Sequence, residues 1–163
     1  MDYLYANRRD YFNRDKSLPN CAFCDALAKA DSFENLIVFR GEDSFVILNK
    51  YPYTSGHMMV VPYLHTCHFE ELDTNTLTEM MLLSKRCVTT LTQIYQAQGF
   101  NIGFNIGSAG GAGIAEHLHM HIVPRWHRDT NFITVLGQAR VLPESLEESY
   151  QQIKNAWQGF PNT

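Results

Sequence analysis

The sequence predicts an α+β protein with an antiparallel sheet of about five strands, one long helix and a C-terminal helix. Three observations carry this prediction: short apolar runs separated by turn residues, one long stretch with apolar side chains at three- and four-residue spacing, and the order of these segments. Strands come first, then the long helix, then further strands with short links. This order favours an antiparallel sheet over alternating strand–helix–strand units.

The first sixty residues contain the N-terminal strands. Residues 1–20 are polar and aromatic without clear periodicity, and we expect an extended N-terminal arm. A helical turn is expected at 25–30. Apolar runs at 36–40 and 44–49 are joined by glycine and aspartate, which is typical of a hairpin. A third strand is expected at 57–61, ended by a proline.

The longest helical pattern runs from Asp73 to Gln98, and Gly99 is expected to end it. Its face is defined by residues three or four apart. These residues are Leu77, Met80, Met81, Ser84, Val88, Leu91 and Tyr95.

The remainder of the chain completes the sheet. A fourth strand is expected at 100–106, followed by a glycine-rich loop at 107–113 and a fifth strand at 117–123. A terminal helix is expected at 144–157. We expect one domain over residues 1–163, with residues 138–163 as a C-terminal extension.

The overall charge restricts the partners. The 163 residues carry a formal net charge of -4, which gives no whole-chain attraction to nucleic acids or acidic membranes, so neither is an expected partner. No segment approaches the roughly 20 apolar residues that span a bilayer, and charges interrupt the N-terminus before a signal peptide develops. A cytoplasmic location is therefore expected, with Cys67 and Cys87 reduced and Cys87 in the core.

Three histidines alternate with apolar residues near the end of the chain. His117, His119 and His121 would share one face of a strand, while the residues between them point into the core. Neutral imidazole suits two roles, a metal ligand and a nucleophile. The histidines alone leave open a metal-only site and a nucleophile beside a metal.

The glycine-rich loop immediately before the histidines favours a nucleophile acting on phosphate. Flexible glycine backbones expose several N–H groups and form anion sites. The loop lacks the Gly-Lys-Ser/Thr of a P-loop. The pair Cys21 and Cys24 suits metal or redox chemistry; a thioredoxin-like redox pair normally follows a strand, which is not predicted here.

These motifs together resemble the histidine triad (HIT) family. The run 117–123 is similar to its signature, and Cys21-Ala-Phe-Cys24 is similar to the zinc pair of the zinc-containing members. The resemblance covers most of the chain. Further similar segments are Ser55-Gly-His57, Val60-Val-Pro62, Gly103-Phe-Asn105, 121–126 and 131–137, the last two resembling the bacterial branch that includes diadenosine tetraphosphate phosphorylases.

The resemblance implies a HIT-like fold and an enzyme that cleaves dinucleoside polyphosphates, with water or orthophosphate as acceptor. His119 would attack the α-phosphorus and form a covalent nucleotidyl intermediate, and His121 would stabilise charge on the phosphate. Substrate-binding positions implied by the family are Asn49, Asn105, Ser108, Gly110, Gly111 and Gly113. For Asn49, the closing of a turn is an equal alternative.

The resemblance also implies a structural zinc ion and a homodimer. Cys21, Cys24, His65 and His117 would complete a tetrahedral site, with His68 as the rival third ligand. The dimer would join two sheets through the long helix and an edge strand.

One segment before the histidines departs from the pattern of the family. Many members carry Gln followed by Ser or Thr before the histidines, and this chain has Gly113-Ile-Ala-Glu116 there. Ser108 and Glu116 are the candidates to help the leaving group depart.

Two other functions compete with the cleavage of dinucleoside polyphosphates. A nucleoside phosphoramidase or nucleotidyl transferase is the second hypothesis, and a non-catalytic nucleotide-binding interaction protein is the third. The basic segment 125–128 favours a polyphosphate substrate, with a solvated surface as an equal alternative.

Overall fold

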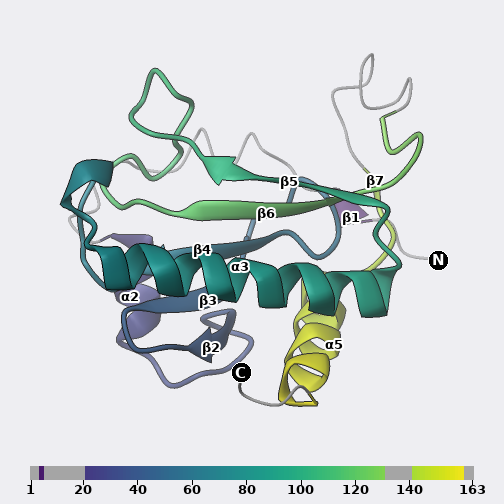
Figure 1. The fold of residues 1–163 in the computed structure, drawn as a ribbon. Coiled ribbons are helices and arrows are strands. Elements are labelled where there is room, and N and C mark those ends of the chain that lie inside the picture. Colours follow the sequence, from purple (N-terminus) through teal and green to yellow (C-terminus); the bar gives the residue numbers. More distant parts are fainter. Residues whose placement is uncertain (1–3, 6–20, 131–140, 160–163) are drawn as a thin grey trace.

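A five-stranded antiparallel sheet forms the centre of the molecule, in the order β2-β3-β4-β6-β5 (Figure 1). The computed structural model describes residues 4–5, 21–130 and 141–159. The predicted α+β class and the hairpin between the first two strands of this sheet are confirmed. The strands are β2 (Ile37–Arg40), β3 (Ser44–Leu48), β4 (Met58–Pro62), β5 (Gly99–Phe104) and β6 (Met120–Arg125).

Two of the predicted strands have other bounds in the structure. The strand expected at 117–123 is β6 and begins only at Met120, because the residues before it have left the ladder; the Leu118 N–H donates to the Thr66 carbonyl instead (2.8 Å). The strand expected at 100–106 is β5, which ends at Phe104.

A second, two-stranded sheet was not predicted. It pairs β1 (Leu4–Tyr5) with β7 (Val141–Leu142), so segments from the two ends of the chain lie side by side. The remainder of the expected N-terminal arm and the segment 131–137 lie outside the described residues.

The long helix α3 (Thr74–Tyr95) runs across one face of the sheet (Figure 1). Asp73 caps its N-terminus by accepting the Thr76 N–H at 2.8 Å. The prediction that Gly99 ends the helix was wrong: Gln96, with φ 50°, takes the left-handed conformation and its N–H donates to the Thr92 carbonyl. Gly99 instead opens β5.

The apolar side of the sheet lies under α3, which contacts β3, β4 and β6. Met120 of β6 points to this side, where its sulfur lies 3.8 Å from Ser84 Oγ of α3. The C-terminal helix α5 (Leu146–Gln158) packs against α3 and β2, close to the predicted 144–157. A capping box between Ser145 and Glu148 begins it.

The short helix α2 (Ala22–Leu27) begins earlier than the helical turn expected at 25–30. Asn35 Nδ2 donates to the Ala26 carbonyl at 3.1 Å, and the Arg40 guanidinium donates to the Leu27 carbonyl at 3.3 Å. These two tertiary contacts hold the C-terminal end of α2. They cannot be predicted from the periodicity of the sequence, so the bounds of the helix differ from those expected.

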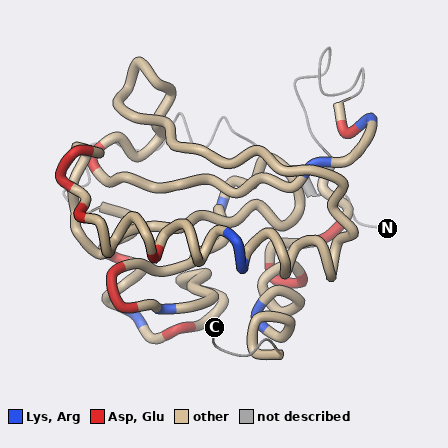
Figure 2. Tube along the Cα trace, viewed as in Figure 1, with Lys and Arg blue, Asp and Glu red and all other residues tan. Residues whose placement is uncertain are grey.

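The charged residues of the described chain are distributed unevenly. Acidic residues gather at the end of the molecule that holds the β2–β3 turn and the loop before α3 (Figure 2). Within the described ranges, no helix has the length and hydropathy needed to cross a membrane.

Candidate active site

A row of paired residues crosses the sheet on the side away from α3. Ile47 of β3 pairs with Met59 of β4, and Met59 pairs with His121 of β6. Directly paired residues in an antiparallel sheet share a face, so the three side chains point the same way. They form one wall of a pocket of ≈ 550 Å³, and α2 forms the facing wall. Its lining includes Phe23, Ala26, Leu36, Ile47, Asn49, Tyr53, Met59, Ser108, Gly111, Gly113, His119 and His121.

His119 lines this pocket, and only one of its two ring nitrogens is engaged by the described residues. Its Nδ1–H donates to the His117 carbonyl at 2.8 Å, which assigns the lone pair to Nε2. Only 5% of the residue is exposed, and burial lowers the pKa of His119 below the usual value for histidine. A neutral imidazole with a fixed tautomer is the state that a nitrogen nucleophile requires.

His121 belongs to a hydrogen-bonded chain with a definite direction. The Tyr53 N–H donates to His57 Nδ1 at 3.1 Å, so the ring proton of His57 lies on Nε2. His57 Nε2 is 2.9 Å from His121 Nδ1, which therefore accepts. Burial, with the neighbouring His119 charge, lowers the pKa of His121 to about 4. Neutral His121 consequently carries its proton on Nε2, where it can donate a hydrogen bond.

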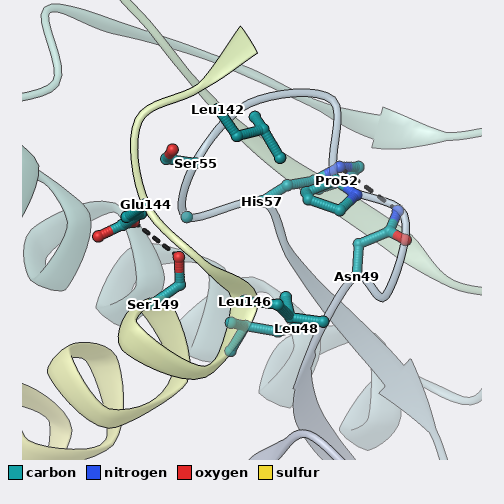
Figure 3. Close-up of a pocket in the computed structure, with 10 residues that line it drawn as sticks. Leu48, Asn49, Pro52, Ser55, His57, Leu142, Glu144, Leu146 and Ser149 are labelled. Carbon is teal, nitrogen blue, oxygen red and sulfur yellow. Dashed lines mark hydrogen bonds between the residues drawn. The ribbon is translucent and has the colours of Figure 1, made fainter. Parts of the chain in front are cut away.

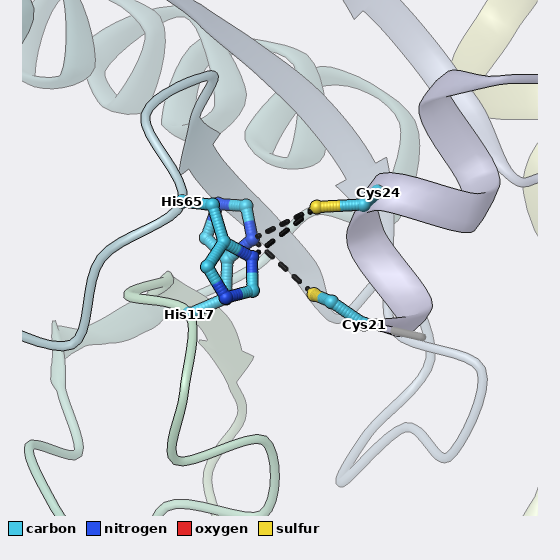
Figure 4. A group of neighbouring side chains, drawn as sticks. All are labelled: Cys21, Cys24, His65 and His117. Carbon is cyan, nitrogen blue, oxygen red and sulfur yellow. Dashed lines mark hydrogen bonds between the residues drawn. The ribbon is translucent and has the colours of Figure 1, made fainter. Parts of the chain in front are cut away.

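Four side chains at the N-terminal end of α2 form a compact Cys₂His₂ cluster (Figure 4). Cys21 Sγ lies 3.3 Å from His117 Nδ1, and Cys24 Sγ lies 3.3 Å from His65 Nδ1. All four ligand atoms lie within 4.8 Å of one another. His68, the rival ligand, lies outside the cluster and 3.6 Å from Glu70.

The donor set fits a tetrahedral zinc ion. Zinc–sulfur and zinc–nitrogen bond lengths imply sulfur–nitrogen edges of about 3.5 Å, close to the distances in the cluster. Burial and the adjacent Cys21 raise the pKa of the Cys24 thiol to about 11, so Cys24 would be a thiolate at neutral pH only beside a bound cation. His117 Nε2–H donates to the Pro62 carbonyl at 2.9 Å and leaves Nδ1 free as a ligand. These contacts favour a metal over a redox pair.

The predicted substrate-binding residues divide into two groups. Asn49, Ser108, Gly111 and Gly113 line the pocket, whereas Asn105 and Gly110 are not among its lining residues. Gly110 has a local role, because a Cβ there would clash with the Ile106 carbonyl oxygen. Asn49 also closes a turn, accepting the Tyr51 N–H at 2.9 Å, and its Nδ2 lies 3.4 Å from His57 Nδ1.

The cations of the pocket are not those expected from the sequence. Arg125 is engaged by Asp129 and by Asn101 Oδ1 (2.6 Å), and the segment 125–128 does not line the pocket. The cationic residues that line the pocket are Lys29 and Lys50. Glu116 likewise lies outside the lining, while Ser108 lies within it.

Two residues of the site cannot be identified from the sequence pattern. His57 contacts His121, which lies 64 residues later in the chain, only because β4 pairs with β6. Phe23 lies between the two cysteines in the sequence, and in the structure it is 3% exposed and lines the pocket. Neither role is indicated by residue spacing.

A second cavity lies behind His57, between α5 and the loop after β3 (Figure 3). Its volume of ≈ 10 Å³ suits at most a water molecule. The larger pocket is therefore the candidate active site.

Known proteins match both the sequence and the fold. The AP-4-A phosphorylase of Mycobacterium tuberculosis is 38% identical over 128 residues, which are 78% of this chain and 66% of that protein. A zinc-bound histidine triad family protein from Mycobacterium smegmatis superposes with a TM-score of 0.68 at 26% identity, covering 85% of this chain and 94% of that one. A hypothetical histidine triad nucleotide-binding protein from Sulfolobus tokodaii gives a TM-score of 0.67 at 28% identity, over 85% and 92% of the two chains.

The chain spans slightly less than two thirds of the mycobacterial phosphorylase. The HIT domain model matches residues 31–128, which include the sheet, α3 and all three histidines of the run. This match, with the sequence and fold similarities, shows that the chain belongs to the histidine triad family.

Proposed function

We propose that this protein cleaves dinucleoside polyphosphates, such as diadenosine tetraphosphate, by transferring a nucleotidyl group to Nε2 of His119. The observation that carries the proposal is the fixed tautomer of His119, a residue that lines the pocket between α2 and the sheet. The relative named AP-4-A phosphorylase supports the substrate class.

The first step is displacement at the α-phosphorus. The Nε2 lone pair forms a nitrogen–phosphorus bond, and the bond to the bridging oxygen breaks with its electron pair on that oxygen, releasing ATP from diadenosine tetraphosphate. His121 Nε2–H and the N–H groups of Gly111 and Gly113 would donate to the phosphate oxygens as charge develops. Lys29 and Lys50 would offset part of the substrate charge.

The second step regenerates His119. An oxygen of orthophosphate attacks the same phosphorus, the nitrogen–phosphorus bond breaks and ADP leaves; water in the same position gives AMP. Terminal phosphates have a second pKa of about 6, so ATP can leave at neutral pH without a strong acid. An amine leaves only when protonated. Of the two candidate donors only Ser108 lines the pocket, and its hydroxyl is a much weaker acid than a carboxyl group, which favours a polyphosphate over a phosphoramidate.

The same proposal assigns a structural zinc ion to Cys21, Cys24, His65 and His117. The ion would supply no chemistry to the substrate. It would link α2 to His117, whose carbonyl orients His119.

Product analysis of diadenosine tetraphosphate, with and without orthophosphate, tests the function. ADP plus ATP that appear only with orthophosphate identify a phosphorylase, and AMP plus ATP without it identify a hydrolase. His119→Ala is expected to lower kcat/KM by at least about 10⁴-fold while AMP still binds. Equal activity in this variant, or turnover of phosphoramidates alone, would overturn the proposal.

A homodimer is also proposed. Met81 and Leu82 on α3 are 61% and 57% exposed, and Ile102 on the edge strand β5 is 46% exposed. A second copy would cover these apolar side chains. Sedimentation equilibrium of the wild type and of Leu82→Glu tests this arrangement, since the charge should produce a monomer.

A further inference from the structure

The ring of Phe23 lies between the metal cluster and the nucleophile. Its centroid is 5.4 Å from the His117 ring, edge to face, and 5.1 Å from the His119 ring. Phe23 therefore touches a proposed metal ligand and the proposed nucleophile at once, and it also lines the nucleotide pocket.

The helix that carries Phe23 has little intrinsic stability. It contains six residues, and its N-cap Cys21 makes no side-chain capping hydrogen bond. Isolated helices of this length are not stable in water, so tertiary contacts must hold it. Asn35 and Arg40 hold its C-terminal end, and the Cys21 and Cys24 contacts to His117 and His65 hold its N-terminal end.

The N-terminal end of α2 is also where the pocket wall meets the cluster. Ala22 and Phe23 lie at this end and line the pocket, and Asp25 and Ala26 line it further along the helix. These residues face the row formed by Ile47, Met59 and His121. Any loosening of this end separates one wall of the pocket from the other. A ligand held between the walls would in turn favour the closed position of α2 and the ligand geometry of Cys21 and Cys24.

We propose that metal binding at the Cys₂His₂ cluster and nucleotide binding in the pocket are thermodynamically coupled, and that Phe23 is the positioning residue that transmits the coupling. This inference rests on the proposed function, because it requires that the pocket bind a nucleotide. Coupling between two sites is reciprocal, so the metal strengthens nucleotide binding by the factor by which the nucleotide strengthens metal binding.

The first test measures the affinity for AMP by calorimetry in zinc-loaded and chelator-treated protein, with circular dichroism to verify the fold of each. We expect AMP to bind about tenfold more tightly to the zinc-loaded protein, within the usual range of coupling. Equal affinity in two folded states overturns the coupling. Failure of AMP to bind the zinc-loaded protein overturns the proposed function instead.

A double-mutant cycle tests the role of Phe23 and keeps three of the four residues of the metal cluster in place. Cys24→Ala removes one ligand on α2 and should weaken AMP binding about tenfold in the wild-type background, but have no further effect in Phe23→Ala. Ile47→Ala is the matched control, since it removes apolar contact from the opposite wall. Its effect should add to that of Cys24→Ala.

Additivity of Cys24→Ala with both pocket variants would overturn the assignment to Phe23. A merely structural role of Phe23 would lower both affinities yet leave the coupling factor at its wild-type value. If Phe23→Ala fails to fold, Phe23→Leu, which keeps most of the apolar volume, is used in the same cycle and should show a smaller non-additivity of the same sign.

Discussion

The helices α2 and α3 are held to opposite faces of the sheet by different kinds of interaction. α3 has 22 residues, a side-chain cap at Asp73, and buried side chains such as Met80 and Leu91 against the apolar face. α2 has six residues. Imidazoles contact its cysteine thiols at one end, and the Asn35 amide and the Arg40 guanidinium donate to its backbone carbonyls at the other. The fold thus depends on apolar burial on one face, and the site depends on a few polar contacts on the other.

The largest effect is expected from breaking the N-terminal attachment of α2. Cys21→Ala should lower the free energy of unfolding of the zinc-loaded protein by about 4 kcal/mol, which corresponds to a fall in Tm of about 10 °C, because a metal ligand is lost. Calorimetry measures the shift. Cys67→Ala is the control: this exposed cysteine lies outside the cluster and should change Tm by less than about 2 °C. Equal shifts in both variants would contradict a metal site.

A pH-dependent effect is expected from the polar face. His121 is kept neutral by burial, with a pKa of about 4 against 6.5 when unfolded, and His57, His119 and Tyr53 face it. Between these two values the unfolded chain binds the extra proton, so the free energy of unfolding falls as pH falls, by up to about 1.4 kcal/mol per unit. Above pH 6.5 His121 is neutral in both the folded and the unfolded chain, and its contribution to the free energy of unfolding is fully present.

Urea unfolding of the wild type and of His121→Asn at pH 7, 6 and 5 measures this contribution. The difference in stability between the two proteins should shrink as the pH falls, while metal release affects both alike. A constant difference over this range would show that His121 is not the titrating group.

The smallest effect is expected from the cap of α3. Asp73→Ala removes the acceptor for the Thr76 N–H and should cost about 1 kcal/mol in urea unfolding. AMP affinity and metal content should not change, because α3 is held along its length by burial. A loss of AMP binding in this variant would show that the two faces are not independent.

The same contrast explains what the sequence could predict. The three- and four-residue periodicity of α3 is a direct consequence of burial along one face, so the helix was placed to within three residues at its C-terminal end. α2 was displaced by three residues at each end, because Asn35 and Arg40, rather than a periodic pattern, determine its end. The cysteine pair and the run of histidines stand out by their chemistry, and the roles of His65, His117 and His119 follow from the resemblance to the family, whereas Phe23 and His57 required the tertiary structure.

The hydrogen-bonded chain that ends at His121 has a consequence for ligand selection. It begins at a backbone N–H, which can donate but never accept, so its polarity cannot reverse while the rings stay neutral. The pocket end of the chain therefore offers only a donor. A ligand group that can only donate, such as an ammonium, would place two donors opposite each other at this point, at a cost of about 1–3 kcal/mol. The backbone N–H of Tyr53 thus favours acceptors such as phosphate oxygens at the pocket end of the chain and disfavours ammonium groups.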